Sequence, residues 1–146
     1  GARQLEKKLS SGPSCSNRGR RILSRYKFYF RGILALENNQ TDEALAEMKE
    51  AVRHLPPTYD MDPLEDCLAQ ALLRVNRFDE AVTEFERVLR LNPNYPLGRF
   101  YLALALERRG QNEKAHENYK LFLELWKDAD ADIPEVIAAR KSLSAP

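Results

Sequence analysis

Asp42-Glu43-Ala44, Asp79-Glu80-Ala81 and Glu113-Lys114-Ala115 are the three stretches that decide the fold of this chain. Their alanines lie 37 and then 34 residues apart, and a helical pattern lies on both sides of each motif. A period of this length is typical of stacked helical hairpins, in which each hairpin buries its apolar face against the next. The spacing therefore predicts an all-α stack of antiparallel helical hairpins, a class of protein that usually binds other proteins.

Apolar residues at helical spacing extend this prediction along the rest of the chain, and no alternating strand pattern occurs. Asn76 and Gly110 are expected to form turns within hairpins, with Gly110 in the left-handed conformation. Thr41 or Asp42 is expected to cap the helix that follows it. The predicted helices span residues 2–10, 18–38, 42–54, 62–75, 78–91, 96–109, 112–128 and about 134–143.

Aligning the three alanines gives a frame of 34 residues in which small and large side chains fall at fixed sites. Small residues are expected where two helices approach closely, and large residues where the next hairpin must be filled. The frame sites hold Gly32/Ala69/Ala103, Ala44/Ala81/Ala115, Met48/Phe85/Tyr119 and Ala51/Val88/Phe122.

This pattern resembles the tetratricopeptide repeat family over about residues 25–128. The resemblance implies a right-handed superhelical stack of about three repeats, with a partial helix at the N-terminus and a capping helix at the C-terminus. The chain departs from the family pattern in its first linker, which has three extra residues, and at Lys127, where proline is expected. The implied divisions are a basic flanking helix and loop, or the end of a preceding repeat, at 1–24, repeats at 25–61, 62–95 and 96–129, and a capping helix and tail at 130–146.

In this family the first helix of each repeat lines a concave groove, which receives a segment of a partner protein. The resemblance implies that the groove residues here are Tyr29, Ile33, Asp66, Gln70, Arg74, Phe100, Leu104 and Arg108. Some members hold the C-terminal carboxylate of a chaperone in a Lys/Asn clamp, but the matching region here holds other residue types, so no such clamp is expected. The groove either receives a partner segment or is covered by the chain itself, through residues 2–10 or an adjacent repeat.

A narrower resemblance concerns residues 119–130, followed by Ile133-Pro134-Glu135-Val136 and Ala139-Arg140-Lys141. This stretch is similar to the last repeat of bacterial multidomain regulators, which often join a kinase, a TolB-like propeller or a DNA-binding module to C-terminal repeats. The alternative function is therefore a regulatory or dimerising C-terminal tail of a bacterial kinase or transcription-related protein.

The charge is unevenly distributed, although the formal net charge is only +1. Residues 1–27 carry eight basic side chains and one acidic one, which leaves 15 basic and 21 acidic residues in the remainder. A basic end can contact nucleic acid or a membrane surface. No aromatic-basic reader motif accompanies it, so a solvated segment is the favoured interpretation and nucleic-acid binding the minor one.

No reactive constellation is found in the sequence. His54 and His116 each stand alone on a predicted helix, without cysteine or carboxylate at metal-ligand spacing. Two cysteines, Cys15 and Cys67, define no disulfide framework, so a reducing, cytoplasmic compartment is expected. No apolar run approaches the roughly 20 residues that span a bilayer. The sequence therefore predicts a non-enzymatic interaction scaffold without cofactor or metal, whose partner is a protein or peptide segment or a second copy of the chain.

Overall fold

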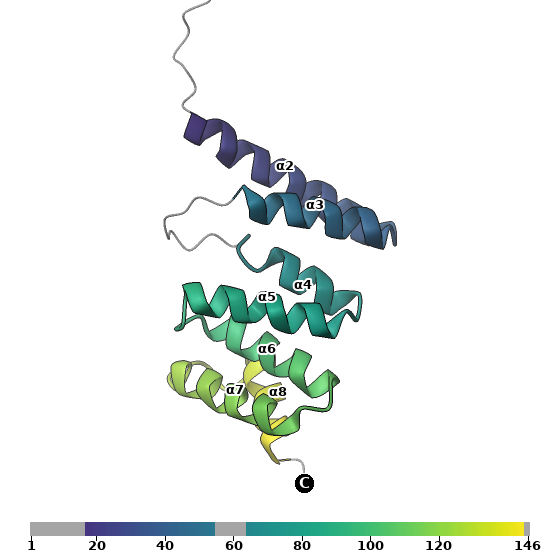
Figure 1. The fold of residues 1–146 in the computed structure, drawn as a ribbon. Coiled ribbons are helices and arrows are strands. Elements are labelled where there is room, and N and C mark those ends of the chain that lie inside the picture. Colours follow the sequence, from purple (N-terminus) through teal and green to yellow (C-terminus); the bar gives the residue numbers. More distant parts are fainter. Residues whose placement is uncertain (1–16, 55–63, 145–146) are drawn as a thin grey trace, which may run out of the picture.

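The computed structural model describes residues 17–54 and 64–144, and every regular element within these ranges is a helix. Figure 1 shows the helices stacked one on another in chain order, from α2 at one end to α7 and α8 at the other. Each helix packs against the next one along the chain. The elements are α2 (Asn17–Glu37), α3 (Thr41–Arg53), α4 (Cys67–Arg74), α5 (Phe78–Leu91), α6 (Pro96–Arg108), α7 (Asn112–Leu125) and α8 (Pro134–Ser144).

The three hairpins, α2/α3, α4/α5 and α6/α7, turn in the same way. Asn39, Asn76 and Gly110 lie between the paired helices with φ of 58°, 62° and 74°. Asparagine and glycine are the residues that adopt this left-handed conformation most readily. The residue after each turn donates its backbone N–H to a carbonyl five residues earlier, as in Gln111 to Leu106 at 2.9 Å. The predicted conformation of Gly110 and the predicted turn at Asn76 are confirmed.

The core is built on the predicted frame. Each motif alanine has no exposed surface, and the four frame sites are buried in all three hairpins. Small residues let the helices approach, and the larger ones fill the space between successive hairpins. The C-terminal half adds a cluster of aromatic rings, in which Phe100 lies 5.7 Å from Tyr119 and 5.3 Å from Phe122 between ring centroids.

Several predicted helix ends differ from the observed ones. Neither Thr41 nor Asp42 caps α3: the N-cap is Gln40, which makes no side-chain capping bond. The cause is the hairpin turn at Asn39, which places Gln40 at the N-cap and Thr41 at the first helical position, so that Asp42 and Glu43 fall within the first turn. Helix α4 starts only at Cys67, because Leu64–Asp66 form a tighter turn that precedes it.

Helix α7 ends at Leu125, three residues before the predicted end, and Trp126 occupies its C-cap. The Trp126 ring packs on Phe122 with centroids 5.2 Å apart, and the backbone turns there toward α8. The predicted helix at 2–10 lies outside the described residues, as does most of the lengthened first linker. The division of the stack into repeats stays a prediction.

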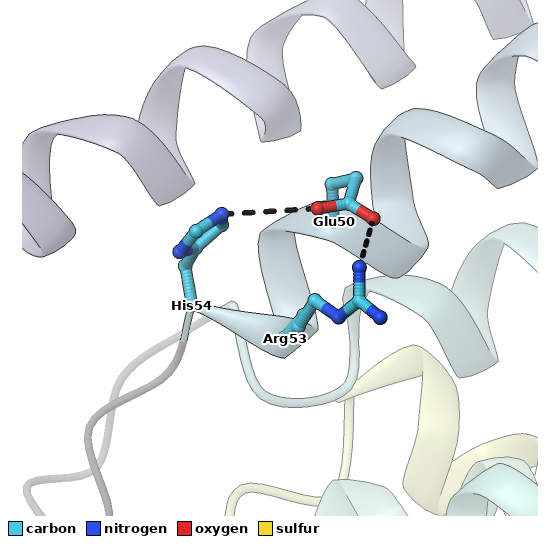
Figure 2. Close-up of polar contacts among 3 residues, drawn as sticks. All are labelled: Glu50, Arg53 and His54. Atoms are coloured by element: carbon cyan, nitrogen blue, oxygen red, sulfur yellow. Dashed lines mark hydrogen bonds and ion pairs between the residues drawn. The ribbon is translucent and has the colours of Figure 1, made fainter.

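The first linker leaves α3 at a cluster of polar and aromatic contacts. Figure 2 shows the Glu50 carboxylate between Arg53, which donates to it at 3.0 Å, and His54, whose Nε2 lies 3.8 Å away. The His54 ring also stacks on Phe28 of α2, with centroids 5.4 Å apart and planes 3° from parallel. His54 therefore fixes the end of α3 against α2, and this accounts for one of the two histidines.

Candidate functional site

A pocket of about 220 Å³ lies where α2 and α3 meet the start of α4. The residues of α2 that line it are three or four positions apart, so they lie on one face of that helix. The lining residues of α4 show the same spacing of three or four positions. Helix α3 contributes a single side chain. The lining residues are Tyr29, Ile33 and Leu36 of α2, Met48 of α3, and Asp66, Cys67, Gln70, Ala71 and Arg74 at and after the start of α4.

Helix packing sets the depth of this pocket. Gly32 of α2 lies so close to α3 that a Cβ atom there would be 2.9 Å from Met48 Cε. Met48 is therefore held against α2, and its flexible thioether lies among the lining residues. Ile33 and Tyr29 remain half-buried, so they offer apolar surface to whatever enters the pocket.

Asp66 is the unusual side chain of the site. It is only 7% exposed and lies at the N-cap of α4, where aspartate ordinarily accepts a bond from the helix's own N–H groups. Here it makes no capping bond. Its Oδ2 instead accepts from the Tyr95 hydroxyl at 2.9 Å and from Gln70 Nε2 at 3.2 Å.

Tyr95 stays a neutral donor in this arrangement. Burial of its ring, together with the adjacent Asp66 carboxylate, raises the pKa of Tyr95 well above the ordinary value of 10.0. A phenolate beside a carboxylate would place two like charges together in a poorly solvated position. The hydroxyl therefore keeps its proton and continues to hold Asp66 near neutral pH.

An ion pair lies at the pocket's outer edge. Arg74 Nη2 lies 2.8 Å from Glu37 Oε1, which ties the end of α4 to the end of α2. Both side chains are more than half exposed, so the pair contributes little stability. It does place a second carboxylate near the pocket, and it occupies the guanidinium of Arg74.

The structure brings together five of the eight predicted groove residues: Tyr29, Ile33, Asp66, Gln70 and Arg74 all line this pocket. The other three lie on α6 and do not. Phe100 is 6% exposed and is a core side chain, packed on Tyr119 and Phe122. Leu104 is half-buried and Arg108 is exposed.

Sequence reasoning missed several residues of the site. Met48 is predicted only as a large residue that fills the space between hairpins, and Cys67 and Ala71 are not among the predicted groove residues, although they directly follow the groove positions Asp66 and Gln70. Their neighbouring places on the helix could have indicated a shared wall. Tyr95 carried no such signal, because it lies 29 residues from Asp66 in the turn before α6.

The described residues offer few other kinds of site. Within 17–54 and 64–144, no group of three or more histidine, cysteine or acidic side chains is arranged to hold a metal ion. In those same ranges no helix combines the length and the apolar character that crossing a membrane requires.

The fold and the pocket define a class of protein, a stack of antiparallel helical hairpins with a pocket between its first two hairpins. The family model described as the tetratricopeptide repeat matches residues 68–130, from α4 to the end of α7. Over this segment the chain is similar to the tetratricopeptide repeat family, whose domains generally mediate protein–protein or peptide binding. Among the curated proteins, none matches the sequence.

Solved structures extend the same fold over most of the chain. The TPR domain of Arabidopsis OM64 is similar with a TM-score of 0.68 at 15% identity, covering 84% of this chain and 96% of that one. PcrH from Pseudomonas aeruginosa gives 0.67 at 16% identity, with coverage of 82% and 88%. The first TPR of Spaghetti (RPAP3), bound to the HSP90 peptide SRMEEVD, gives 0.64 at 19%, with coverage of 84% and 95%. At these identities the likeness establishes the superhelical fold.

Proposed function

We propose that this chain is a non-enzymatic interaction module that binds a segment of a partner protein in the pocket between α2, α3 and α4. The observation that carries the proposal is the pocket itself, where side chains from three helices surround an open space. Its position on the first helix of two successive hairpins agrees with the predicted groove. The binding role of Phe100, Leu104 and Arg108 is not part of this proposal.

The chemistry of the pocket favours a peptide over a small cofactor. At about 220 Å³ it is smaller than the roughly 300–1,000 Å³ typical of small-molecule sites. A volume of this size suits one or two side chains of a peptide, with the apolar wall of Ile33, Leu36 and Met48 as the anchor surface. Interfaces commonly gain most of their affinity from a few such buried anchors.

Relatives of the same fold give a precedent for peptide binding. The first TPR of Spaghetti is bound to a peptide of HSP90, and the second TPR domain of human RPAP3 to a peptide of HSP70. Those ligands belong to those proteins. For this chain they support only the general expectation that a helical groove of this fold can hold an extended segment.

A peptide-display selection with the purified chain tests the proposal. Selected peptides should bind the unchanged chain and lose binding to Ile33→Asp, which places a charge on the apolar wall. The matched control is Leu34→Asp, an adjacent aliphatic residue of the same helix that is 63% exposed and does not line the pocket. Circular dichroism should show both variants folded. Equal binding by both variants would refute the pocket assignment.

A second candidate function is self-association, supported by two exposed apolar side chains of α2 that do not line the pocket. Phe30 and Leu34, four residues apart, are 61% and 63% exposed within the described part of the chain. Isologous packing of two copies through these side chains would bury them. Sedimentation of the chain at rising concentration tests this: Phe30→Ser with Leu34→Ser should abolish any dimer, and a monomer at all concentrations would exclude it.

The remaining predictions go with this proposal. We infer a cytoplasmic location, with which the small number of cysteines in the sequence, Cys15 and Cys67, is compatible. The alternative, a regulatory tail of a bacterial kinase or transcription-related protein, stays a prediction and depends on the sequence around this chain. Nucleic-acid binding by the basic N-terminal residues is the less favoured hypothesis, and it predicts an affinity that falls steeply as the salt concentration rises.

A further inference from the structure

We propose that the segment bound by this pocket carries a lysine or arginine next to its apolar anchor, and that this cation pairs with Asp66. The inference deepens the proposed function and rests on it. It names the chemistry of the partner: a basic-apolar peptide, in contrast to the acidic peptides found on the structural relatives.

The Asp66 carboxylate has no cationic partner within the described residues. Both of its hydrogen bonds come from neutral donors, Tyr95 and Gln70, and both go to Oδ2. No lysine, arginine or histidine within residues 17–54 and 64–144 forms an ion pair with it. A carboxylate that is 7% exposed is therefore held by neutral groups alone.

The basic side chains near Asp66, Arg74 and Arg87, form ion pairs with other carboxylates. Arg74 lines the same pocket but pairs with Glu37 at 2.8 Å. Arg87 pairs with Glu84 at 2.7 Å and also donates to the backbone carbonyl of Glu65, the residue before Asp66. Among the described residues, Arg74 and Arg87 are thus paired with Glu37 and Glu84, and neither forms an ion pair with Asp66.

The unpaired charge of Asp66 favours a ligand that carries a cation. Buried charges in proteins are ordinarily paired, because an isolated ion loses its hydration without compensation. A ligand cation beside Asp66 would supply that pairing, while the apolar wall of Ile33, Leu36 and Met48 receives the adjacent side chain. An acidic ligand would instead meet Asp66 and, at the pocket edge, Glu37. Like-charge contacts of this kind are a common source of specificity.

The test is a double-mutant cycle between the pocket and the peptide. A peptide selected on the unchanged chain is compared with versions in which its basic residue is replaced by glutamine or glutamate, on the unchanged chain and on Asp66→Asn. On the unchanged chain we expect the glutamine version to bind about tenfold more weakly, as for loss of a charge-assisted hydrogen bond, and the glutamate version more weakly still. On Asp66→Asn the basic and glutamine versions should bind alike.

Asp79→Asn is the matched control, because it removes one negative charge from an exposed carboxylate that pairs with Arg109 and lies outside the pocket. It should leave the preference for a basic residue unchanged. If Asp66→Asn fails to fold, the peptide substitutions on the unchanged chain still decide the question.

The two levels of the proposal fail in different ways. Selected peptides that bind with no basic residue, equally to Asp66→Asn, and yet lose binding to Ile33→Asp would overturn the charge inference and leave the pocket assignment standing. Selected peptides that bind Ile33→Asp as well as the unchanged chain would overturn both.

Discussion

The first and last hairpins have the same frame sites, but one borders an open pocket and the other is filled by aromatic side chains. At the first hairpin the frame sites hold Gly32, Met48 and Ala51, and a pocket opens beside them toward α4. At the last hairpin the same sites hold Ala103, Tyr119 and Phe122, and aromatic rings fill the space against α8. Side-chain volume at fixed positions thus separates a part that offers binding surface from a part that provides stability.

The acidic groups at the two ends show the same contrast. Glu107 accepts from Tyr119 at one carboxylate oxygen and from Ser142 of α8 at the other, each at 2.9 Å. Asp66 accepts the two bonds that described residues donate to its side chain at one oxygen, Oδ2. The Glu107 carboxylate of α6 thus binds side chains of both α7 and α8, whereas the other oxygen of Asp66 accepts no bond from a described residue.

The largest difference in the free energy of unfolding is expected between truncations of core side chains in the last and in the first hairpin. Phe122→Ala should lower the free energy of unfolding by about 3–5 kcal/mol, because it removes a fully buried ring from a tightly packed cluster. Met48→Ala should cost less, toward about 2 kcal/mol, because it removes a smaller and more flexible side chain which, although only 1% exposed, borders the pocket. Urea unfolding followed by circular dichroism measures both. Equal costs would contradict the division between a filled end and an open end.

Removing the hydroxyl of Tyr95 or of Tyr119 should give a smaller difference in the free energy of unfolding. Tyr95→Phe should cost about 2 kcal/mol, since it leaves the buried Asp66 carboxylate with Gln70 as its remaining donor. Tyr119→Phe should cost about 1 kcal/mol, because Glu107 is exposed and water can replace the lost donor. The same unfolding measurement applies, and a smaller cost for Tyr95→Phe would mean that Asp66 is better solvated than described.

Gly32 and Gly98 each lie close to a neighbouring side chain, and they should respond differently to substitution by alanine. At Gly98 an added Cβ would lie 2.7 Å from Tyr95 Cδ1, and that ring is fixed by its bond to Asp66. Gly98→Ala should therefore cost about 1 kcal/mol despite the better helix propensity of alanine. At Gly32 the obstacle is the flexible end of Met48, so Gly32→Ala should be nearly neutral in stability. Thermal melts of the two variants provide the comparison, and an unchanged melting temperature for Gly98→Ala would contradict a fixed Tyr95 ring.

The smallest effect is expected at the pocket edge. Arg74→Ala should change the free energy of unfolding by less than about 1 kcal/mol, because both members of its ion pair with Glu37 are largely exposed. The Arg53–Glu50 pair on α3, also solvent-facing, is the matched comparison through Arg53→Ala. A substantial loss of stability in Arg74→Ala alone would mean that this pair joins the first two hairpins more firmly than its exposure suggests.

The sequence predicted the helices and their frame well because both depend on local patterns. The buried sites follow from the period of the motif alanines, and the turns at Asn76 and Gly110 follow from residues that tolerate positive φ. Helix starts were less predictable: the left-handed turn at Asn39 selects Gln40 as the N-cap whatever the capping strength of its neighbours.

The candidate site was predictable only in part. Helical spacing places Asp66, Gln70 and Arg74 on one face, but it does not tell whether a large apolar residue such as Phe100 faces the groove or the core. That choice depends on Tyr119 and Phe122 of the following helix, which surround the ring of Phe100. The bond between Tyr95 and Asp66 joins residues far apart in the sequence, so no local pattern indicates it.

The most direct test of the pocket as the binding site is methionine-methyl NMR. The chain has only two methionines, and the Met48 side chain lines the pocket. With the ε-methyl groups labelled and Met48 assigned through Met48→Leu, addition of a selected peptide should shift the Met48 resonance in the unchanged chain and in Leu34→Asp, but not in Ile33→Asp. A peptide that binds the unchanged chain and leaves the Met48 resonance where it was would contradict the account.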